Sequence, residues 1–248
     1  MKKIGVVIPA GGNGMRMSAS GAADGVPKQF MILAGLPVLA HSIRTFGAVA
    51  PEVDIVVALP ADHLRTWASL CREYDVPPHK TCVGGATRFL SVRNAMENLD
   101  PDCELIAVHD GARPLVSPAL IRRTVEIARR HGTAIPAIPV NDTVRRIGLE
   151  GVSHPEDRAT LRAVQTPQVF RVDILRDAYA KASDGMTENE NRNKGEGGGD
   201  RDGSGKKFTD DGSVVEAAGY DLTLCEGERR NIKITEPADM AIAGALMC

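Results

Sequence analysis

The stretch "IPAGGNGMRMSASGAADGVPKQF", residues 8–30, joins an apolar strand to a glycine-rich loop. Glycine has no Cβ, so the backbone N–H groups of such a loop can approach a phosphate or a base closely. The same stretch holds two cations, Arg16 and Lys28, separated mostly by small residues. A flexible loop with positive charges of its own, placed after a first strand, predicts a binding site for an anionic nucleotide.

Short apolar runs alternate with helical patterns along the chain. The runs predicted as strands are 3–9, 53–60, 80–85 and 104–110. Between them apolar residues recur at the helical spacing of about 3.6 residues. Ser117 and Pro118 form a good N-cap and first-turn pair for one of these helices. Continuous apolar strands alternating with helices indicate an α/β fold with a Rossmann-like, mainly parallel sheet flanked by helices.

Two segments depart from this alternation. Residues 141–162 carry Gly, Pro and charge at hairpin intervals, so we predict a β-arm that protrudes from the sheet. Residues 183–207 are almost devoid of apolar side chains, so after a helix over 172–182 we predict a disordered insertion. Residues 231–247 are predicted as a strand that runs into a C-terminal helix, which completes a single domain over 1–248.

Three types of phosphate-binding loop compete for the glycine-rich stretch. The dinucleotide fingerprint G-x-G-x-x-G/A matches Gly12 and Gly14 but needs a small residue where Met17 stands. The Walker A loop needs Gly-Lys-Ser/Thr, whereas Lys28 stands between a proline and a glutamine. The third type wraps a nucleoside triphosphate with backbone and supplies cations from its own length. This third type agrees best with the sequence.

Separated blocks of the chain resemble one enzyme family. The ordered set Pro9-Ala10-Gly11-Gly12-x-Gly14-x-Arg16-Met17, followed by Pro27-Lys28-Gln29-Phe30, resembles the signature loop of nucleotidyltransferases of the glycosyltransferase-A type. Further blocks resemble those of the 2-C-methyl-D-erythritol 4-phosphate cytidylyltransferase family: "GGATRFLSV" (84–92), "VHDGARP" (108–114), "PVNDTVR" (139–145), "QTPQVF" (165–170) and "NIKIT" (231–235). The resemblance covers nearly the whole chain except 183–207, and it implies the glycosyltransferase-A-type fold.

The resemblance also implies roles for residues in these blocks. The residues implied to hold cytidine triphosphate (CTP) are Pro9, Ala10, Gly11, Gly12, Asn13, Gly14, Gly85 and Ser91. The cations implied in catalysis are Arg16, Lys28, Arg158 and Lys233. The residues implied to hold the phosphate of the second substrate are Arg113, Thr143, Arg158 and Lys233. Arg offers two parallel N–H donors to phosphate and Lys a point charge, so this cluster suits a phosphomonoester.

Asp110 is the predicted metal ligand. It stands at the C-terminal end of a predicted parallel strand, where open α/β sheets place ligand groups. A carboxylate there suits Mg²⁺ bound to triphosphate oxygens. The alternative interpretation is that Asp110 caps a turn next to Gly111. His109 points to the opposite strand face, so it is interpreted as a packed residue rather than a ligand.

The implied reaction transfers a cytidylyl group from CTP to 2-C-methyl-D-erythritol 4-phosphate and releases pyrophosphate, as a step of non-mevalonate isoprenoid biosynthesis. A ribitol-5-phosphate cytidylyltransferase is the alternative within the same fold, because the nucleotide half of the site would look alike. The alternatives from another class are an NAD-binding protein and a nucleotide-binding protein without catalysis. An NAD-binding protein would need the third small residue of the dinucleotide fingerprint, which this chain lacks. The second gives no reason to keep together Arg16, Lys28, Asp110, Arg158 and Lys233.

Composition and charge limit the partners. The chain has 30 basic and 32 acidic residues, so no global field recruits nucleic acid or an acidic membrane surface. No apolar run is long enough to cross a membrane, and the five cysteines form no C-x-x-C pair, so we expect a cytoplasmic protein with reduced thiols. By the resemblance, the arm at 141–162 reaches a second subunit, which implies a homodimer in which Thr143 and Arg158 serve the neighbour's site.

Overall fold

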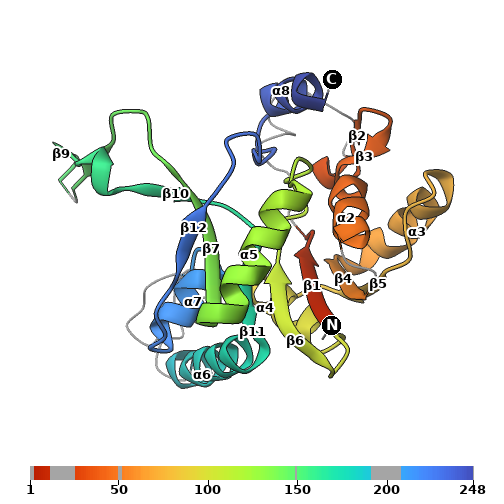
Figure 1. Cartoon of the computed structure of the whole chain (residues 1–248), viewed down its shortest axis with the longest axis horizontal. Coiled ribbons are helices and arrows are strands. Elements are labelled where there is room, and N and C mark those ends of the chain that lie inside the picture. The colour runs from red at the N-terminus through yellow and green to blue at the C-terminus, as the bar shows by residue number, and fades with distance from the viewer. Residues whose placement is uncertain (1–2, 12–25, 50–51, 149, 191–207, 248) are drawn as a thin grey trace.

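The structure is a computed structural model that describes residues 3–11, 26–49, 52–148, 150–190 and 208–247, with only the backbone described for 185–190. Its centre is an eight-stranded sheet (Figure 1). The strands of the parallel half are β1 (Lys3–Pro9), β4 (Val53–Leu59), β5 (Lys80–Val83) and β6 (Cys103–Val108). The strands of the other half are β7 (Thr133–Pro139), β10 (Arg162–Val164), β11 (Gln168–Arg171) and β12 (Leu224–Glu226).

The strand order is β10-β7-β11-β6-β1-β4-β5, with β12 paired to β7. β1 lies between β4 and β6 and is parallel to both, and β5 continues the parallel half beyond β4. β11 runs antiparallel to β6 and β7, so the half of the sheet around β7 is mixed. The predicted α/β fold with a mainly parallel sheet is therefore confirmed.

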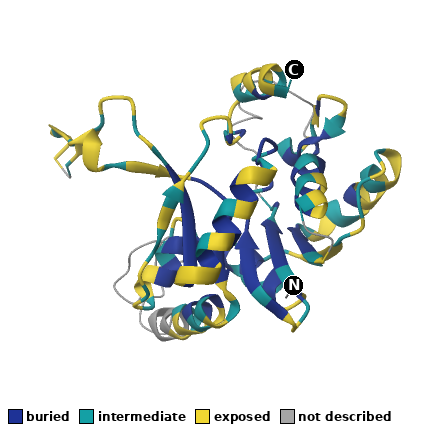
Figure 2. Ribbon diagram, in the orientation of Figure 1, coloured by how far each residue is buried: buried dark blue, intermediate teal, exposed yellow. Residues whose placement is uncertain are grey.

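Helices cover both faces of the sheet because the strand residues alternate between two cores. One core joins Val6 and Ile8 of β1 to the helices α2 (Val38–Val49), α3 (Leu64–Glu73) and α5 (Pro118–His131). The other joins Val7 to the helices α4 (Arg88–Met96), α6 (Val172–Glu190) and α7 (Asp211–Ala217). Figure 2 shows the central strands as the most deeply buried part of the molecule.

A third, smaller cluster lies beside the sheet. The C-terminal helix α8 (Pro237–Met247) buries Ala243 against Leu33 and Val38. Leu33 belongs to a small hairpin of β2 (Ile32–Leu33) and β3 (Leu36–Pro37), which follows the short 3₁₀ helix η1 (Lys28–Phe30). A second short 3₁₀ helix, η2 (Ala61–His63), follows β4. This cluster places the residues after 230 beside the start of η1.

The predicted N-cap of α5 is present, and α4 has a cap that was not predicted. The Ser117 hydroxyl accepts a hydrogen bond from the Leu120 N–H, and Pro118 is the first residue of α5, as predicted. α4 begins after Thr87, whose hydroxyl accepts from the Leu90 N–H. A cap at Thr87 fixes the direction of the chain where the loop 84–87 enters α4.

Two predictions about regular structure are wrong. α6 continues to Glu190, eight residues beyond the predicted end at 182, so the first part of the predicted insertion is helical; residues 191–207 lie outside the described residues. Residues 231–235 do not form a strand. Their backbone bonds serve loops: the Ile234 N–H donates to the carbonyl of Ala112, and the Ile232 N–H to that of Arg230.

The segment 141–162 extends away from the central sheet in Figure 1. It contains β8 (Arg145–Ile147) and β9 (Ser153–Pro155), which pair with each other as an antiparallel two-stranded sheet. A single 3₁₀ turn, η3 (Arg158–Thr160), leads back to β10. Elsewhere, none of the described helices has both the length and the apolar character needed to cross a bilayer.

Candidate active site

A cavity of about 560 Å³ opens where the parallel strands end. Parallel strands place their carboxyl ends along one edge of a sheet, so loops from distant parts of the chain meet there. The cavity residues are Pro9, Ala10, Gly11, Lys28, Gln29, Pro60, Gly84, Gly85, Ala86, Thr87, Arg88, Ser91, Asp110, Gly111, Ala112 and Lys233. The predicted site residues Pro9, Ala10, Gly11, Lys28, Gly85, Ser91, Asp110 and Lys233 are therefore brought together.

The loop from Gly84 to Thr87 lines one wall with little more than backbone. Ser91, which is buried, shapes this loop: its hydroxyl lies 3.1 Å from the Gly85 N–H and donates to the carbonyl of Thr87 at 2.8 Å. A Cβ on Gly85 would lie 2.2 Å from the Cβ of Leu90, so only glycine fits without displacing α4. Ser91 thus contributes to the wall mainly by holding the loop.

Lys28 also lines the cavity, next to the C-terminal segment, and the adjacent Gln29 contacts the start of the loop after the first strand. The buried side-chain amide of Gln29 donates to the carbonyl of Ala10 at 2.8 Å, which joins the two ends of the glycine-rich stretch. The ammonium of Lys28 donates to the carbonyl of Ile234 at 2.9 Å. Lys28 therefore lies beside the segment that carries Lys233.

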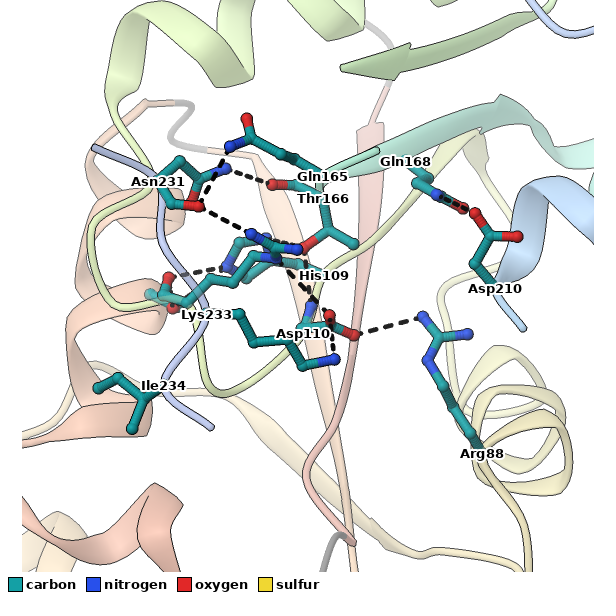
Figure 3. A network of polar contacts seen from close by, with 12 residues as sticks. Arg88, His109, Asp110, Gln165, Thr166, Gln168, Asp210, Asn231, Lys233 and Ile234 are labelled. Atoms are coloured by element: carbon teal, nitrogen blue, oxygen red, sulfur yellow. Dashed lines mark hydrogen bonds and ion pairs between the residues drawn. The ribbon is translucent and has the colours of Figure 1, made fainter. Parts of the chain in front are cut away.

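Asp110 is the anionic centre of the cavity. Its carboxylate lies 2.8 Å from the ammonium of Lys233 and 3.5 Å from the guanidinium of Arg88 (Figure 3). Arg113 approaches the same carboxylate at 3.6 Å. Burial alone would raise the pKa of Asp110, but the charges of Arg88, Lys233 and Arg113 outweigh burial and hold the pKa well below its usual range. Asp110 is thus ionised and shared by three cations.

Comparison with known proteins decides the family. The family model described as 2-C-methyl-D-erythritol 4-phosphate cytidylyltransferase matches residues 4–248. The chain belongs to this family. A relative from Azobacteroides pseudotrichonymphae carrying the same description is 39% identical over 249 residues and covers 100% of both chains. A second, from Porphyromonas gingivalis, is 40% identical and covers 97% of this chain and 96% of its own.

Solved structures agree with the cytidylyltransferase family. The crystal structure of 2-C-methyl-D-erythritol 4-phosphate cytidylyltransferase from Thermus thermophilus is 32% identical, with a TM-score of 0.72 and 98% of each chain covered. A structure of 4-diphosphocytidyl-2C-methyl-D-erythritol synthase from Anaerococcus prevotii is 26% identical, with a TM-score of 0.74, and covers 99% of this chain and 98% of its own. The chain is accordingly a nucleotidyltransferase.

Arg88 lies in the candidate active site, but the sequence pattern alone assigned it no role. It lines the cavity and donates to the buried carboxylate of Asp211 at 2.7 Å, in addition to its contact with Asp110. Burial alone would lower the pKa of Arg88, but the charges of Asp211 and Asp110 raise it above its usual range. The available signal was its place in the block "GGATRFLSV", where it is the only charged residue.

Arg113 lies behind Asp110 rather than in the cavity lining. Its side chain is 12% exposed and donates to the carbonyl of Asn231 at 2.7 Å. The side chain of Asn231 in turn donates to the carbonyl of Thr166 at 2.8 Å (Figure 3). In this position Arg113 holds the segment that carries Lys233, and its predicted contact with the second substrate's phosphate stays a prediction.

His109 is fully buried, which confirms its interpretation as a packed residue. One ring nitrogen lies 3.0 Å from the Thr166 hydroxyl and the other 3.3 Å from the Ser42 hydroxyl. Burial lowers the pKa of His109 to about 4, so the ring is neutral near pH 7. The Thr166 hydroxyl also accepts from the Asp110 N–H at 3.0 Å, so this neutral cluster supports the backbone of Asp110.

The remaining predicted site residues fall into two groups. Gly12, Asn13, Gly14 and Arg16 lie outside the described residues. Thr143 and Arg158 are exposed on the extended segment 141–162, and Arg158 donates to the carbonyl of Asn141 at 2.5 Å. Their predicted roles stay predictions.

Asp110 offers one carboxylate to a metal ion, which fits a cation whose other ligands are substrate oxygens. Within the described residues no group of three or more His, Cys, Asp or Glu could hold a metal ion. One carboxylate that lines a cavity is, however, what Mg²⁺ needs when substrate phosphates supply further oxygens. The cations of the lining, Lys28, Arg88 and Lys233, also make the cavity suited to a ligand with several negative charges.

Proposed function

We propose that this chain transfers the cytidylyl group of CTP to 2-C-methyl-D-erythritol 4-phosphate, forming 4-diphosphocytidyl-2-C-methyl-D-erythritol and pyrophosphate. The observation that carries the proposal is the family match over residues 4–248. The cavity supports it, because Lys28, Arg88 and Lys233 surround Asp110 at the carboxyl ends of the parallel strands. Such a site favours a polyphosphate over a neutral ligand.

In the proposed reaction a phosphate oxygen of the second substrate attacks the α-phosphorus of CTP. A new oxygen–phosphorus bond forms while the bond from the α-phosphorus to the bridging oxygen breaks, and pyrophosphate leaves with the electron pair. No general base is needed, since a phosphomonoester with a second pKa near about 6 is largely a dianion at neutral pH. Catalysis then depends on positioning and on neutralising charge.

The chain's own residues supply both effects. Lys28 neutralises charge that develops on the α-phosphate and the leaving pyrophosphate, and we assign the same role to Arg16. Lys233 orients the attacking phosphate. The backbone of the loop 84–87, held by Ser91, takes the nucleoside, because this loop lines the cavity mostly with backbone.

Members of the family generally use a divalent cation, and we propose Mg²⁺ at Asp110. When bound, this ion neutralises and aligns triphosphate oxygens. Asp110 is prepared for the role because its carboxylate is ionised and its backbone N–H is anchored to Thr166.

The proposed activity is tested by measuring pyrophosphate release with each nucleoside triphosphate, Mg²⁺ and either methylerythritol phosphate or ribitol 5-phosphate. We expect release with CTP and methylerythritol phosphate. Release only with ribitol 5-phosphate would move the assignment to the other polyol. Absence of release with CTP and both polyol phosphates would contradict the transferase proposal.

We further propose a homodimer in which the segment 141–162 of one subunit completes the site of the other. The segment extends away from the central sheet, so Thr143 and Arg158 are exposed and outside the lining of their own subunit's cavity (Figure 1). Its tip carries exposed apolar side chains, with Ile147 65% and Val152 54% exposed. Apolar groups of this size at the end of an extended hairpin favour contact with another protein surface.

Complementation between inactive subunits tests this arrangement. Lys28→Ala and Arg158→Ala homodimers should each be nearly inactive. After subunit exchange, mixed dimers hold one site with both residues intact, so random pairing should restore about a quarter of the wild-type activity. No recovery, with subunit exchange verified by differently tagged chains, would place Arg158 in its own subunit's site. An active Arg158→Ala homodimer would place it outside catalysis.

A further inference from the structure

Arg88 joins two carboxylates with different surroundings. Its guanidinium donates to Asp211 at 2.7 Å and lies 3.5 Å from Asp110. Asp211 is fully buried, whereas Asp110 faces the cavity. The shorter contact is with the buried partner, so Asp211 fixes where the guanidinium lies.

Each carboxylate oxygen of Asp211 accepts a hydrogen bond, one of them from Arg88. Its second carboxylate oxygen accepts from the hydroxyl of Tyr179 at 2.7 Å, and the Tyr179 ring stacks on Phe89, next to Arg88 in α4. Asp211 is the first residue of α7, and the preceding Asp210 caps that helix. A buried carboxylate with two strong donors is an immobile anchor for a cation.

The anchor is also tied to the strand that leads to Asp110. The amide of Gln168 donates to Asp210 at 2.7 Å and accepts from the Gly212 N–H at 2.9 Å. Gln168 pairs with Val108, two residues before Asp110. Figure 3 shows Asp210 and Arg88 on the same side of Asp110. The start of α7 and the end of β6 thus keep a fixed spacing, which Arg88 spans.

We propose that Asp211 is a positioning residue of the transferase reaction, which acts by holding the guanidinium of Arg88 against Asp110 at the cavity wall. Arg88 and Lys233 then contact different oxygens of Asp110, Oδ1 and Oδ2. The carboxylate is thereby fixed in one orientation before the substrates bind. Arg88 also leaves a positive edge facing the triphosphate. This inference rests on the proposed function, because the reaction is its readout.

The test is a double-mutant cycle between Arg88 and Asp211. Asp211→Asn should lower kcat/KM for CTP by about 10- to 100-fold, as expected for loss of a group that orients a ligand residue. In an Arg88→Met background the same change should cost less than about 2-fold, because its target is already gone. Equal losses in both backgrounds, or no loss in either, would overturn the proposal.

Asp177→Asn is the matched control. Asp177 also accepts from a tyrosine hydroxyl, that of Tyr220 at 2.8 Å, and pairs with Lys181 at 2.7 Å, but it lies on the exposed side of α6. The kcat/KM of Asp177→Asn should equal that of the parent.

If Asp211→Asn does not fold, Tyr179→Phe takes its place in the cycle. A smaller loss of kcat/KM that disappears in the Arg88→Met background supports the proposal, and an additive loss contradicts it. Inactivity of the parent protein would instead contradict the proposed function itself.

Discussion

Lys28→Ala is expected to lower the turnover of cytidylyl transfer by about 10²- to 10³-fold, the usual cost of removing one preorganised donor from a developing charge. The physical reason lies in the position of the ammonium. It lines the cavity and is held by the carbonyl of Ile234, so its charge is in place before the reaction begins. Pyrophosphate release at saturating CTP measures the effect.

Two further variants serve as comparisons for Lys28→Ala. Lys28→Gln keeps a donor for the carbonyl of Ile234 but removes the charge, so it should be nearly as inactive as Lys28→Ala. Lys80→Ala removes a lysine that is half exposed and paired with Asp54 at the edge of the sheet, and it should retain parent activity. Near-parent turnover in both Lys28 variants would contradict its catalytic role.

Asp110→Asn is the second change with a large expected effect, again about 10²- to 10³-fold in turnover. The amide nearly preserves the shape of the side chain but removes the anion shared by Arg88, Arg113 and Lys233. It also removes the proposed ligand of Mg²⁺, so the Mg²⁺ concentration needed for half-maximal rate should rise. The melting temperature should fall, because the mostly buried side chain of Arg113 loses its counter-ion.

The dependence on Mg²⁺ distinguishes the metal role from a purely structural one. A variant that loses turnover at an unchanged Mg²⁺ requirement would indicate that Asp110 serves only as an ion-pair centre or turn cap. Asp62→Asn, at an exposed carboxylate in η2, should change neither turnover nor Mg²⁺ requirement. The melting temperature of each protein shows how much of any loss comes from the fold.

Much of the fold follows from local sequence patterns. The runs at 3–9 and 53–60 form central strands because their side chains are apolar on both faces, and only a buried sheet satisfies such runs. The segment 231–235 has the same apolar and polar composition as an edge strand, yet it is not one. Its hydrogen-bond partners include the carbonyl of Ala112 and the side chain of Lys28, which the sequence places far away.

The end of α6 shows a different limit. The loss of apolar residues after 182 predicts the end of order, but the helix continues to Glu190. A helix that is already nucleated can extend through polar residues, since each added residue gains one backbone hydrogen bond. Amino-acid composition therefore predicts which residues lack core contacts more directly than it predicts their backbone conformation.

Local sequence patterns were enough to predict a glycine-rich loop after the first strand and the strand ends that line the cavity, and the blocks that carry Lys28, Asp110 and Lys233 were found by their resemblance to the family. These features depend on residue type and on near neighbours, which a sequence displays directly. Only the tertiary structure decided that Arg88 joins Asp110 to the buried Asp211, and that Arg113 lies behind the cavity. Those contacts join residues up to 123 positions apart, and which cations reach a shared carboxylate depends on packing distances that no local pattern encodes.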